Sequence, residues 1–159
     1  MGVPGQIPRR HGKVSFFATA VPMTDAVTAL LFHPRLRKLS IAGAGAMYLT
    51  ILVAGSIPGA RADIGQYASG AMLHSTAYAV LASLCFFGSS GSLAARACKA
   101  VLAVAAMGAG DEFVQSFFPY RGADVRDWAV DCASAVVTCS LLSLLLPLLL
   151  PRAASAARR

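Results

Sequence analysis

The sequence predicts an all-α protein: a bundle of four transmembrane helices whose N- and C-termini are both cytoplasmic. Hydrophobic residues make up 57% of the 159 residues and charged residues only 13%, against about 45–50% and about 25% in typical soluble proteins. The charges gather in short groups between apolar runs, and each run approaches the roughly 20 residues that cross a bilayer. A soluble helical bundle is the less favoured alternative, because its helices need a polar stripe and residues 136–150 have none.

The four apolar runs can be followed in order along the chain. The first covers residues 39–57 and is ended by Pro58 and Gly59, and the second covers residues 70–87 and ends before the loop GSSGS. The third covers residues 97–118 up to Pro119, and the fourth covers residues 128–150, with two prolines near its exit. The second and third runs contain more polar groups, together with several Gly or Ala residues, so their apolar character is less pronounced than that of the first and fourth runs.

The basic residues indicate how the helices are oriented, because Lys and Arg in short loops stay on the cytoplasmic side. Eleven of them fall on the predicted inner side and three on the outer side, which are Arg61, Arg121 and Arg126. The inner ones are Arg9, Arg10, Lys13, Arg35, Arg37, Lys38, Arg96, Lys99, Arg152, Arg158 and Arg159. All acidic residues except Asp25 belong to the outer half of the molecule.

The runs divide the chain into three parts. We expect residues 1–37 to be a disordered cytoplasmic tail, residues 38–151 to be the membrane domain, and residues 152–159 to be a basic cytoplasmic tail. The N-terminal part also imitates a short signal peptide, Met23 is an alternative start site, and residues 26–32 could form an interfacial helix. The true start therefore stays open between Met1 and Met23.

The net charge of +7 raises the question of nucleic acid binding. The basic residues stand beside apolar runs and form no single polar face, so they are better explained as topology signals, and no nucleic acid partner is expected. Cys85, Cys98, Cys132 and Cys139 form no C-x-x-C pair. We expect them to pack between helices and not to form disulfides or a zinc site.

The segment from Asp111 to Asp131 is the strongest candidate for a functional site. It places Asp111 and Glu112 in the outer half of the third helix, although a charged group at the bilayer centre costs about 2.5–3.5 kcal/mol on insertion scales. Helical spacing puts Gln115 near both carboxylates. Retaining these groups implies polar partners or access to water.

Further polar residues should meet the two acids, because a short connection makes the third and fourth helices antiparallel neighbours. Asp127 and Asp131 share a face of the fourth helix, Asp124 is placed to cap its start, and Arg121 and Arg126 are placed to pair with the acids. The second helix contributes His74 and Tyr78. The predicted binding residues are His74, Tyr78, Asp111, Glu112, Gln115, Arg121, Asp127 and Asp131.

Three interpretations of this cluster stay open. It could be a structural network that joins the helices, a binding pocket, or a catalytic site in which Asp111 or Glu112 acts as an acid–base group. No Ser or Cys nucleophile with a nearby base is recognisable. The acids and His74 include possible metal ligands but lack the spacing of a metal motif, so we expect no bound metal and no cofactor.

In this order and spacing, these residues resemble the VanZ-like family of small bacterial membrane proteins over about residues 45–140. The motifs are GSIPG at residues 55–59, H-x-x-x-Y at 74–78, D-E-x-x-Q at 111–115, F-x-P-x-R at 117–121 and D-x-x-x-D at 127–131. The chain departs from the family pattern at Ala71, where a Lys is common, at Asp131, where Asn is common, and at Ser134, where Gly is usual. The absent Lys argues against a Lys–carboxylate pair.

The resemblance implies a four-helix protein of the bacterial cytoplasmic membrane. The family takes its name from an association with glycopeptide resistance; likeness of fold does not transfer that activity to this chain, and a link to envelope stress or glycopeptide resistance is an expectation only. Together with the outer cluster, the resemblance favours a non-enzymatic protein that binds an envelope lipid, a cell-wall precursor or an amphiphilic drug. The alternatives are an enzyme acting on a lipid-linked substrate and a small oligomeric transporter. The expected partners are membrane lipids and, in addition, a second copy of the chain or another membrane protein.

Overall fold

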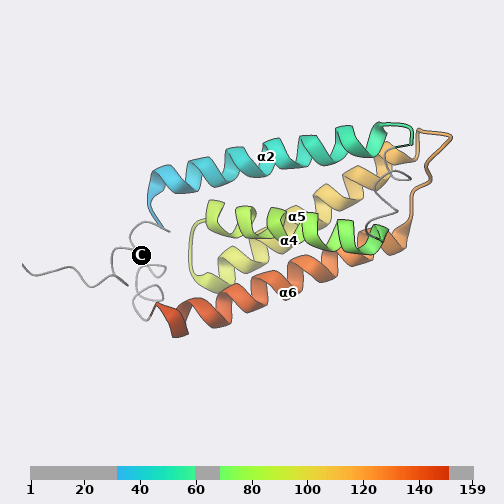
Figure 1. Ribbon diagram of the computed structural model, residues 1–159. Coiled ribbons are helices and arrows are strands. Elements are labelled where there is room, and N and C mark those ends of the chain that lie inside the picture. Colours follow the sequence, from blue (N-terminus) through green and yellow to red (C-terminus); the bar gives the residue numbers. More distant parts are fainter. Residues whose placement is uncertain (1–31, 60–68, 151–159) are drawn as a thin grey trace, which may run out of the picture.

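The computed structural model describes residues 32–59 and 69–150, and they form four α-helices with no strand among them. The helices, labelled as in Figure 1, are α2 (Pro34–Ser56), α4 (Gly70–Gly88), α5 (Leu93–Gln115) and α6 (Val125–Leu149). Each is long and apolar enough to cross a membrane. The predicted all-α, four-helix transmembrane architecture is therefore confirmed.

The helices run alternately up and down, so the described segment starts and finishes at the same end of the bundle (Figure 1). Helices α4 and α5 lie in the middle and contact each other, α2 and α6. We call the end with the start of α2, the α4–α5 loop and the finish of α6 the basic end. The opposite end, which carries the carboxylates of α5 and α6, is the acidic end.

Local capping sets where each helix starts. The ring of His33 accepts a hydrogen bond from the backbone N–H of Arg35, and Pro34 occupies the first turn, where its missing N–H costs nothing. Residues 34–37 are therefore the first turn of α2 and not part of the N-terminal tail that the sequence predicts. Ser69, Ser92 and Asp124 cap the other three helices, and the role of Asp124 was predicted.

Helix α5 ends three residues earlier than the sequence indicated. The N–H groups of Phe117 and Phe118 bond to carbonyls three residues back, which is the tighter pairing typical of helix termini. Pro119 follows, and the residue before a proline avoids the α conformation. The aromatic residues after Gln115 thus belong to the turn that leads to α6. Because they are apolar, the run in the sequence is longer than the helix.

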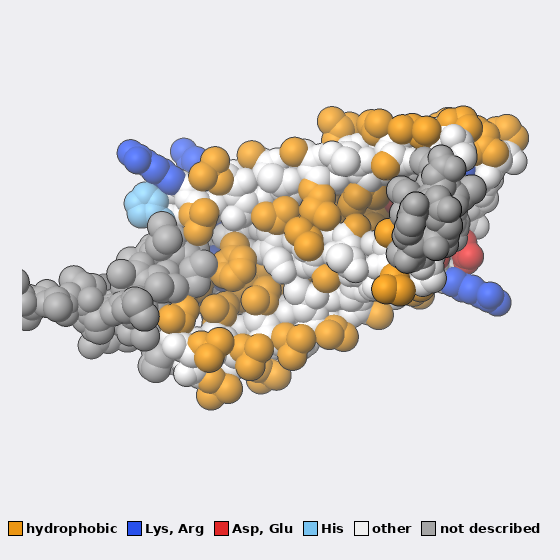
Figure 2. Space-filling view, viewed as in Figure 1, with side chains coloured by type: hydrophobic (Ala, Val, Ile, Leu, Met, Phe, Trp, Pro, Cys, Tyr) orange, Lys and Arg blue, Asp and Glu red, His pale blue; other side chains and the backbone are white. Residues whose placement is uncertain are grey.

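The bundle has an apolar exterior and polar groups inside. Leu39, Leu102 and Leu148 are 67%, 71% and 75% exposed, whereas Asp111 and Asp131 are 1% and 0% exposed. Figure 2 shows hydrophobic side chains along the visible face and Lys or Arg gathered near its ends. A soluble protein would show the reverse distribution, so this surface is suited to lipid and is that of a multi-pass membrane protein.

The apolar core lies where α4 meets its neighbours. Tyr78, Leu81, Phe86, Val104 and Cys139 are almost completely buried there. All four cysteines are free: Cys139 is buried, Cys85 and Cys132 are half-buried, and Cys98 is exposed, so Cys98 does not pack between helices as expected.

Glycine at position 108 lets α5 and α6 approach closely. A Cβ atom there would lie 3.0 Å from Asp131 Oδ2 and 3.2 Å from Trp128 Cδ1. The Trp128 indole N–H donates to the Ala105 carbonyl at 3.0 Å, so the ring bridges the two helices. The expected antiparallel contact between them is confirmed.

Several expectations concern residues outside the described ranges. They are the signal-like segment, the alternative start at Met23, most of the proposed interfacial helix at residues 26–32, and the basic tail at residues 152–159. The outer basic residue Arg61 also lies outside these ranges.

Candidate ligand site at the acidic end

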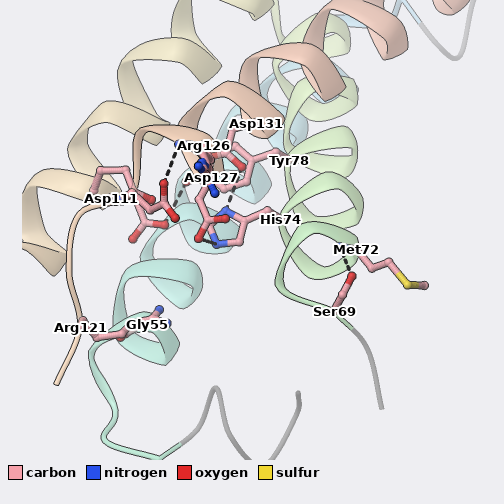
Figure 3. A network of polar contacts seen from close by, with 12 residues as sticks. Gly55, Ser69, Met72, His74, Tyr78, Asp111, Arg121, Arg126, Asp127 and Asp131 are labelled. Atoms are coloured by element: carbon pink, nitrogen blue, oxygen red, sulfur yellow. Dashed lines mark hydrogen bonds and ion pairs between the residues drawn. The ribbon is translucent and has the colours of Figure 1, made fainter. Parts of the chain in front are cut away.

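Five polar side chains from three helices turn towards one another at the acidic end (Figure 3). His74 and Tyr78 come from α4, Asp111 from α5, and Asp127 and Asp131 from α6. His74 and Asp111 each lie four residues from a helix terminus, or about 6 Å along the axis at 1.5 Å per residue. The cluster therefore lies about one turn inside the bundle.

His74 joins α4 to α6. Its Nδ1 lies 3.0 Å from Asp131 Oδ1, and its Nε2 lies 3.7 Å from Asp127 Oδ2. Because both ring nitrogens face carboxylates, an imidazolium ion would satisfy both contacts. The spacing of four residues between Asp127 and Asp131 is what places them on either side of one ring.

Tyr78 joins α4 to α5. Its hydroxyl group donates to Asp111 Oδ2 at 3.2 Å, and its ring stacks parallel to that of His74, with 5.9 Å between centroids. Within the described part of the chain, the other oxygen of Asp111, Oδ1, has no hydrogen-bond partner although it is shielded from solvent. Asp111 is thus fixed through one oxygen and keeps the second available.

Glu112 has a different surrounding from Asp111, its neighbour in sequence. Its Oε2 accepts a hydrogen bond from the backbone N–H of Asp124 at 2.6 Å. The Asp124 carboxylate in turn accepts from the backbone N–H of Arg126 at 2.8 Å. Glu112 therefore ties the finish of α5 to the start of α6, which is a structural task.

Arg121 reaches from the α5–α6 connection to the finish of α2. Its Nε donates to the Gly55 carbonyl oxygen at 3.0 Å, and Tyr120 donates its hydroxyl to the Ser56 carbonyl oxygen at 2.6 Å. The last carbonyls of a helix lack intrahelical donors, so these side chains close the end of α2.

The expected pairing of arginines with acids is not found among residues 32–59 and 69–150. The ion pairs between described residues join His74 to Asp127 and Asp131. Arg121 instead donates a hydrogen bond to the Gly55 carbonyl of α2, and the side chain of Arg126 is exposed. The prediction was wrong because a sequence does not show that the finish of α2 offers a nearer acceptor.

Three polar atoms converge over Gly55. A Cβ atom at this position would lie 3.3 Å from Arg121 Nη2, 3.4 Å from Gln115 Nε2 and 3.6 Å from Asp111 Oδ1. Any side chain would enter the space that these atoms surround. Glycine at position 55 therefore keeps a guanidinium, an amide and a carboxylate close together without filling the gap between them.

The convergence point borders a cavity of about 220 Å³ between α2, α4 and α5. Its apolar wall comes from Ile51, Ala54, Leu73 and Ala77, with the glycines at 55 and 70. Its polar lining consists of His74, Tyr78, Asp111, Gln115 and Arg121. The cavity thus combines an apolar wall with a small set of charged and hydrogen-bonding groups, as ligand sites do.

The structure divides the eight predicted site residues into two groups. His74, Tyr78, Asp111, Gln115 and Arg121 line the cavity, whereas Glu112, Asp127 and Asp131 do not. The latter three are buried behind it and contact the backbone of the connection or His74. Asp111 and Glu112, equivalent as acid–base candidates in the sequence, therefore differ in access to a ligand.

Sequence reasoning missed the contribution of α2. Ile51, Ala54 and Gly55 form one wall, but an apolar run carries no signal that tells a cavity wall from a lipid-facing surface. The GSIPG motif was the available sign, since its first glycine is the one that Arg121 contacts.

The described residues contain no group of three or more His, Cys, Asp or Glu side chains arranged to hold a metal ion. The donors that do meet, His74 with Asp127 and Asp131, already contact one another. The polar contacts of the site among the described residues are therefore hydrogen bonds and ion pairs.

No protein-family model, curated protein or solved structure is significantly similar to this chain. The VanZ-like resemblance therefore stays a prediction from the residues, and the function has to be argued from the cavity.

Proposed function

We propose that this chain is a non-enzymatic, VanZ-like protein of the bacterial cytoplasmic membrane that binds the polar head of an amphiphile at its acidic end. The amphiphile is an envelope lipid, a cell-wall precursor or a drug of similar character. The observation that carries the proposal is the cavity lined by Asp111 and Arg121 on one side and by apolar groups on the other.

The size of the cavity supports a headgroup as the occupant. At about 220 Å³ it is smaller than the roughly 300–1,000 Å³ of sites that enclose a drug-sized ligand. The apolar part of the ligand would then lie outside, along the bundle. Leu49, Val53 and Met72 are 61%, 54% and 61% exposed on α2 and α4, two of the three helices that frame the cavity.

A binding role also fits the chemistry of the lining better than catalysis does. Among the described residues, the lining contains no Ser, Thr or Cys side chain that could attack a substrate, and Glu112 is engaged by the backbone of Asp124. In the orientation that the basic residues favour, the acidic end faces away from the cytoplasm, where envelope lipids and cell-wall precursors are exposed.

The proposal is tested by native mass spectrometry of protein purified with the lipids that it retains from the host membrane. The wild-type chain should carry a bound amphiphile, and Arg121→Ala should lose most of it because this removes the one arginine that the described residues contribute to the cavity lining. Arg126→Ala is the matched control, since this side chain is exposed and lies outside the lining. Equal occupancy in wild type and Arg121→Ala, or no bound amphiphile in either, would contradict the proposal.

A further inference from the structure

Resting on the proposed function, we infer that the cavity selects amphiphiles whose headgroup is a zwitterion with a primary ammonium group. In this assignment Arg121 and Gln115 bind the anionic oxygen, and Asp111 accepts hydrogen bonds from the ammonium group.

The first support is that two opposite charges line one small cavity without pairing. Asp111 and Arg121 both border it, yet ion pairs between described residues, taken as nitrogen–oxygen distances up to 4.0 Å, involve only His74. Charged groups kept from water are costly unless they are paired. A ligand with both charges would supply the missing partner to each.

The second support is that each side chain is held in place by a neighbour. Tyr78 binds Oδ2 of Asp111 at 3.2 Å, and the Gly55 carbonyl binds Nε of Arg121 at 3.0 Å. These contacts occupy one polar atom of each group. They leave Oδ1 of the carboxylate and the Nη atoms of the guanidinium for a ligand.

The third support is that the free polar atoms lie close to one common point. Arg121 Nη2, Gln115 Nε2 and Asp111 Oδ1 all lie within 3.6 Å of one point over Gly55. Their mutual separation suits a headgroup whose opposite charges are only a few bonds apart, such as a phosphodiester or carboxylate near an amine. A guanidinium binds such an oxyanion through two parallel hydrogen bonds.

The fourth support distinguishes the type of cation. Asp111 is 1% exposed, and its Oδ1 lacks a hydrogen-bond partner among the described residues. A buried acceptor needs a donor. An ammonium group with N–H bonds provides one, whereas a quaternary ammonium group does not, so ethanolamine-type headgroups should be preferred to choline-type ones.

The test measures binding of water-dispersible short-chain lipids to the full chain in detergent by calorimetry. The probes are dihexanoyl forms of phosphatidylethanolamine, phosphatidylcholine and phosphatidylglycerol, together with free glycerophosphoethanolamine. We expect the ethanolamine lipid to bind about tenfold or more tightly than the choline lipid, because one hydrogen bond to a charged group is lost. The anionic glycerol lipid should also bind more weakly, since its hydroxyl groups can donate to Asp111 but supply no positive charge to balance the carboxylate.

Variants assign the preference to residues. Asp111→Asn should reduce the ethanolamine-to-choline ratio towards one, which a purely structural role of Asp111 would not do. Gly55→Ala should weaken all lipids by placing a methyl group among the three polar atoms. Gly45→Ala is the matched control in the same helix, because nothing lies within 4 Å of its added Cβ.

The outcomes separate this inference from the function on which it rests. If all three lipids bind equally and Arg121→Ala still weakens them, the amphiphile site stands and the zwitterion preference is wrong. If free glycerophosphoethanolamine binds as tightly as the lipid, the ligand is a soluble zwitterion and the amphiphile assignment is overturned. If no probe binds, both proposals fail.

Discussion

Glu112 and Asp111 are adjacent carboxylates with opposite tasks at the scale of single residues. Asp111 borders the cavity, while Glu112 lies outside its lining and receives the backbone N–H of Asp124 at 2.6 Å; each keeps one buried oxygen without a hydrogen-bond partner among the described residues. Adjacent helix positions point about 100° apart, since a turn takes 3.6 residues. One side chain therefore faces the space beside α2 and the other faces the connection to α6.

Removing the Glu112 contact should destabilise the fold. Glu112→Ala leaves the Asp124 N–H without its acceptor, and a hydrogen bond to a charged group contributes about 1.5–3 kcal/mol. We expect a loss of that order in the free energy of unfolding, measured by SDS titration of the protein in mixed micelles. Glu112→Gln should keep most of the stability because its amide oxygen still accepts. If Glu112→Ala leaves the free energy of unfolding unchanged, the contact has no structural importance.

The residue-level picture was only partly accessible from the sequence. The similar depth of His74 and Tyr78 in the bundle predicted that they would meet the acids of the other helices, and His74 does contact Asp131 while Tyr78 contacts Asp111. The sequence could not predict that Arg121 would bind Gly55, a residue 66 positions away. Pattern arguments see neighbours three and four residues apart on one helix, and a backbone carbonyl freed at a helix end carries no sequence signal.

At the scale of elements, the contact between α5 and α6 depends on the missing side chain at position 108. We expect Gly108→Ala to reduce the free energy of unfolding by about 1–3 kcal/mol, as overpacking does, because the new methyl group meets Asp131 at 3.0 Å and Trp128 at 3.2 Å. The same SDS titration measures the effect. Gly43→Ala is the control, since its Cβ would touch only Leu84, at the ordinary distance of 3.7 Å. Equal effects of both substitutions would show that the helices can separate freely.

The α4–α5 loop depends on one buried arginine at the basic end. Arg96 donates from Nε to the Gly91 carbonyl at 2.9 Å and from Nη1 to the Ser89 carbonyl at 2.5 Å. Gly91 has φ of +105°, a conformation that L side chains rarely adopt. The guanidinium thus organises the turn by binding carbonyls that have left the helix.

Replacing this arginine should loosen the loop without unfolding the bundle. We expect Arg96→Ala to raise the rate of proteolysis within residues 89–92, followed by mass spectrometry of the fragments. Lys99→Ala should have a smaller effect, because Lys99 is exposed and contacts the loop only at the Ser90 carbonyl. Unchanged cleavage in the Arg96 variant would show that the loop is held by other contacts.

The existence and order of the elements were predictable, because apolar runs of membrane-crossing length are a strong signal. Their pairing was less so: the short connection predicted the contact of α5 with α6, whereas the packing of α4 on α6 was indicated only through the expected polar cluster. Helix ends were the least predictable. The first turn of α2 contains Arg35 and Arg37, so hydropathy placed its start too late, although the His33 cap and Pro34 define it.

At the scale of the whole molecule, the charges are divided between the two ends of the bundle. Arg35, Arg37, Lys38, Arg96 and Lys99 belong to the basic end, and the carboxylates of α5 and α6 belong to the other. In the proposed orientation the basic end faces the cytoplasm and the cavity lies near the outer leaflet.

Cysteine labelling of intact cells tests this orientation. In a variant whose four natural cysteines are replaced, Gly122→Cys should react with a membrane-impermeant maleimide, because this position is exposed at the acidic end. Ser90→Cys, in the loop at the basic end, should react only after the membrane is permeabilised. The reverse pattern would turn the cavity towards the cytosol and remove the access that the proposed function requires.

The buried carboxylates also bear on how the molecule enters the membrane. Helix α5 carries Asp111 and Glu112 about one turn from its end, and an acidic residue in the hydrocarbon opposes insertion, by about 2.5–3.5 kcal/mol where it reaches the bilayer centre. Their partners are Tyr78 on α4 and the backbone of Asp124 before α6. Helix α5 therefore gains from insertion together with its neighbours, which a hydropathy profile of the isolated segment does not reveal.

The indole bridge between α5 and α6 gives the protein an internal optical reporter. Trp128 is the single tryptophan of the chain, so light that excites indoles is absorbed at one known place. Its ring donates to the Ala105 carbonyl and lies against the position of Gly108. The wavelength of its fluorescence should therefore follow the separation of these two helices in the unlabelled protein, including any movement that accompanies a ligand arriving in the cavity.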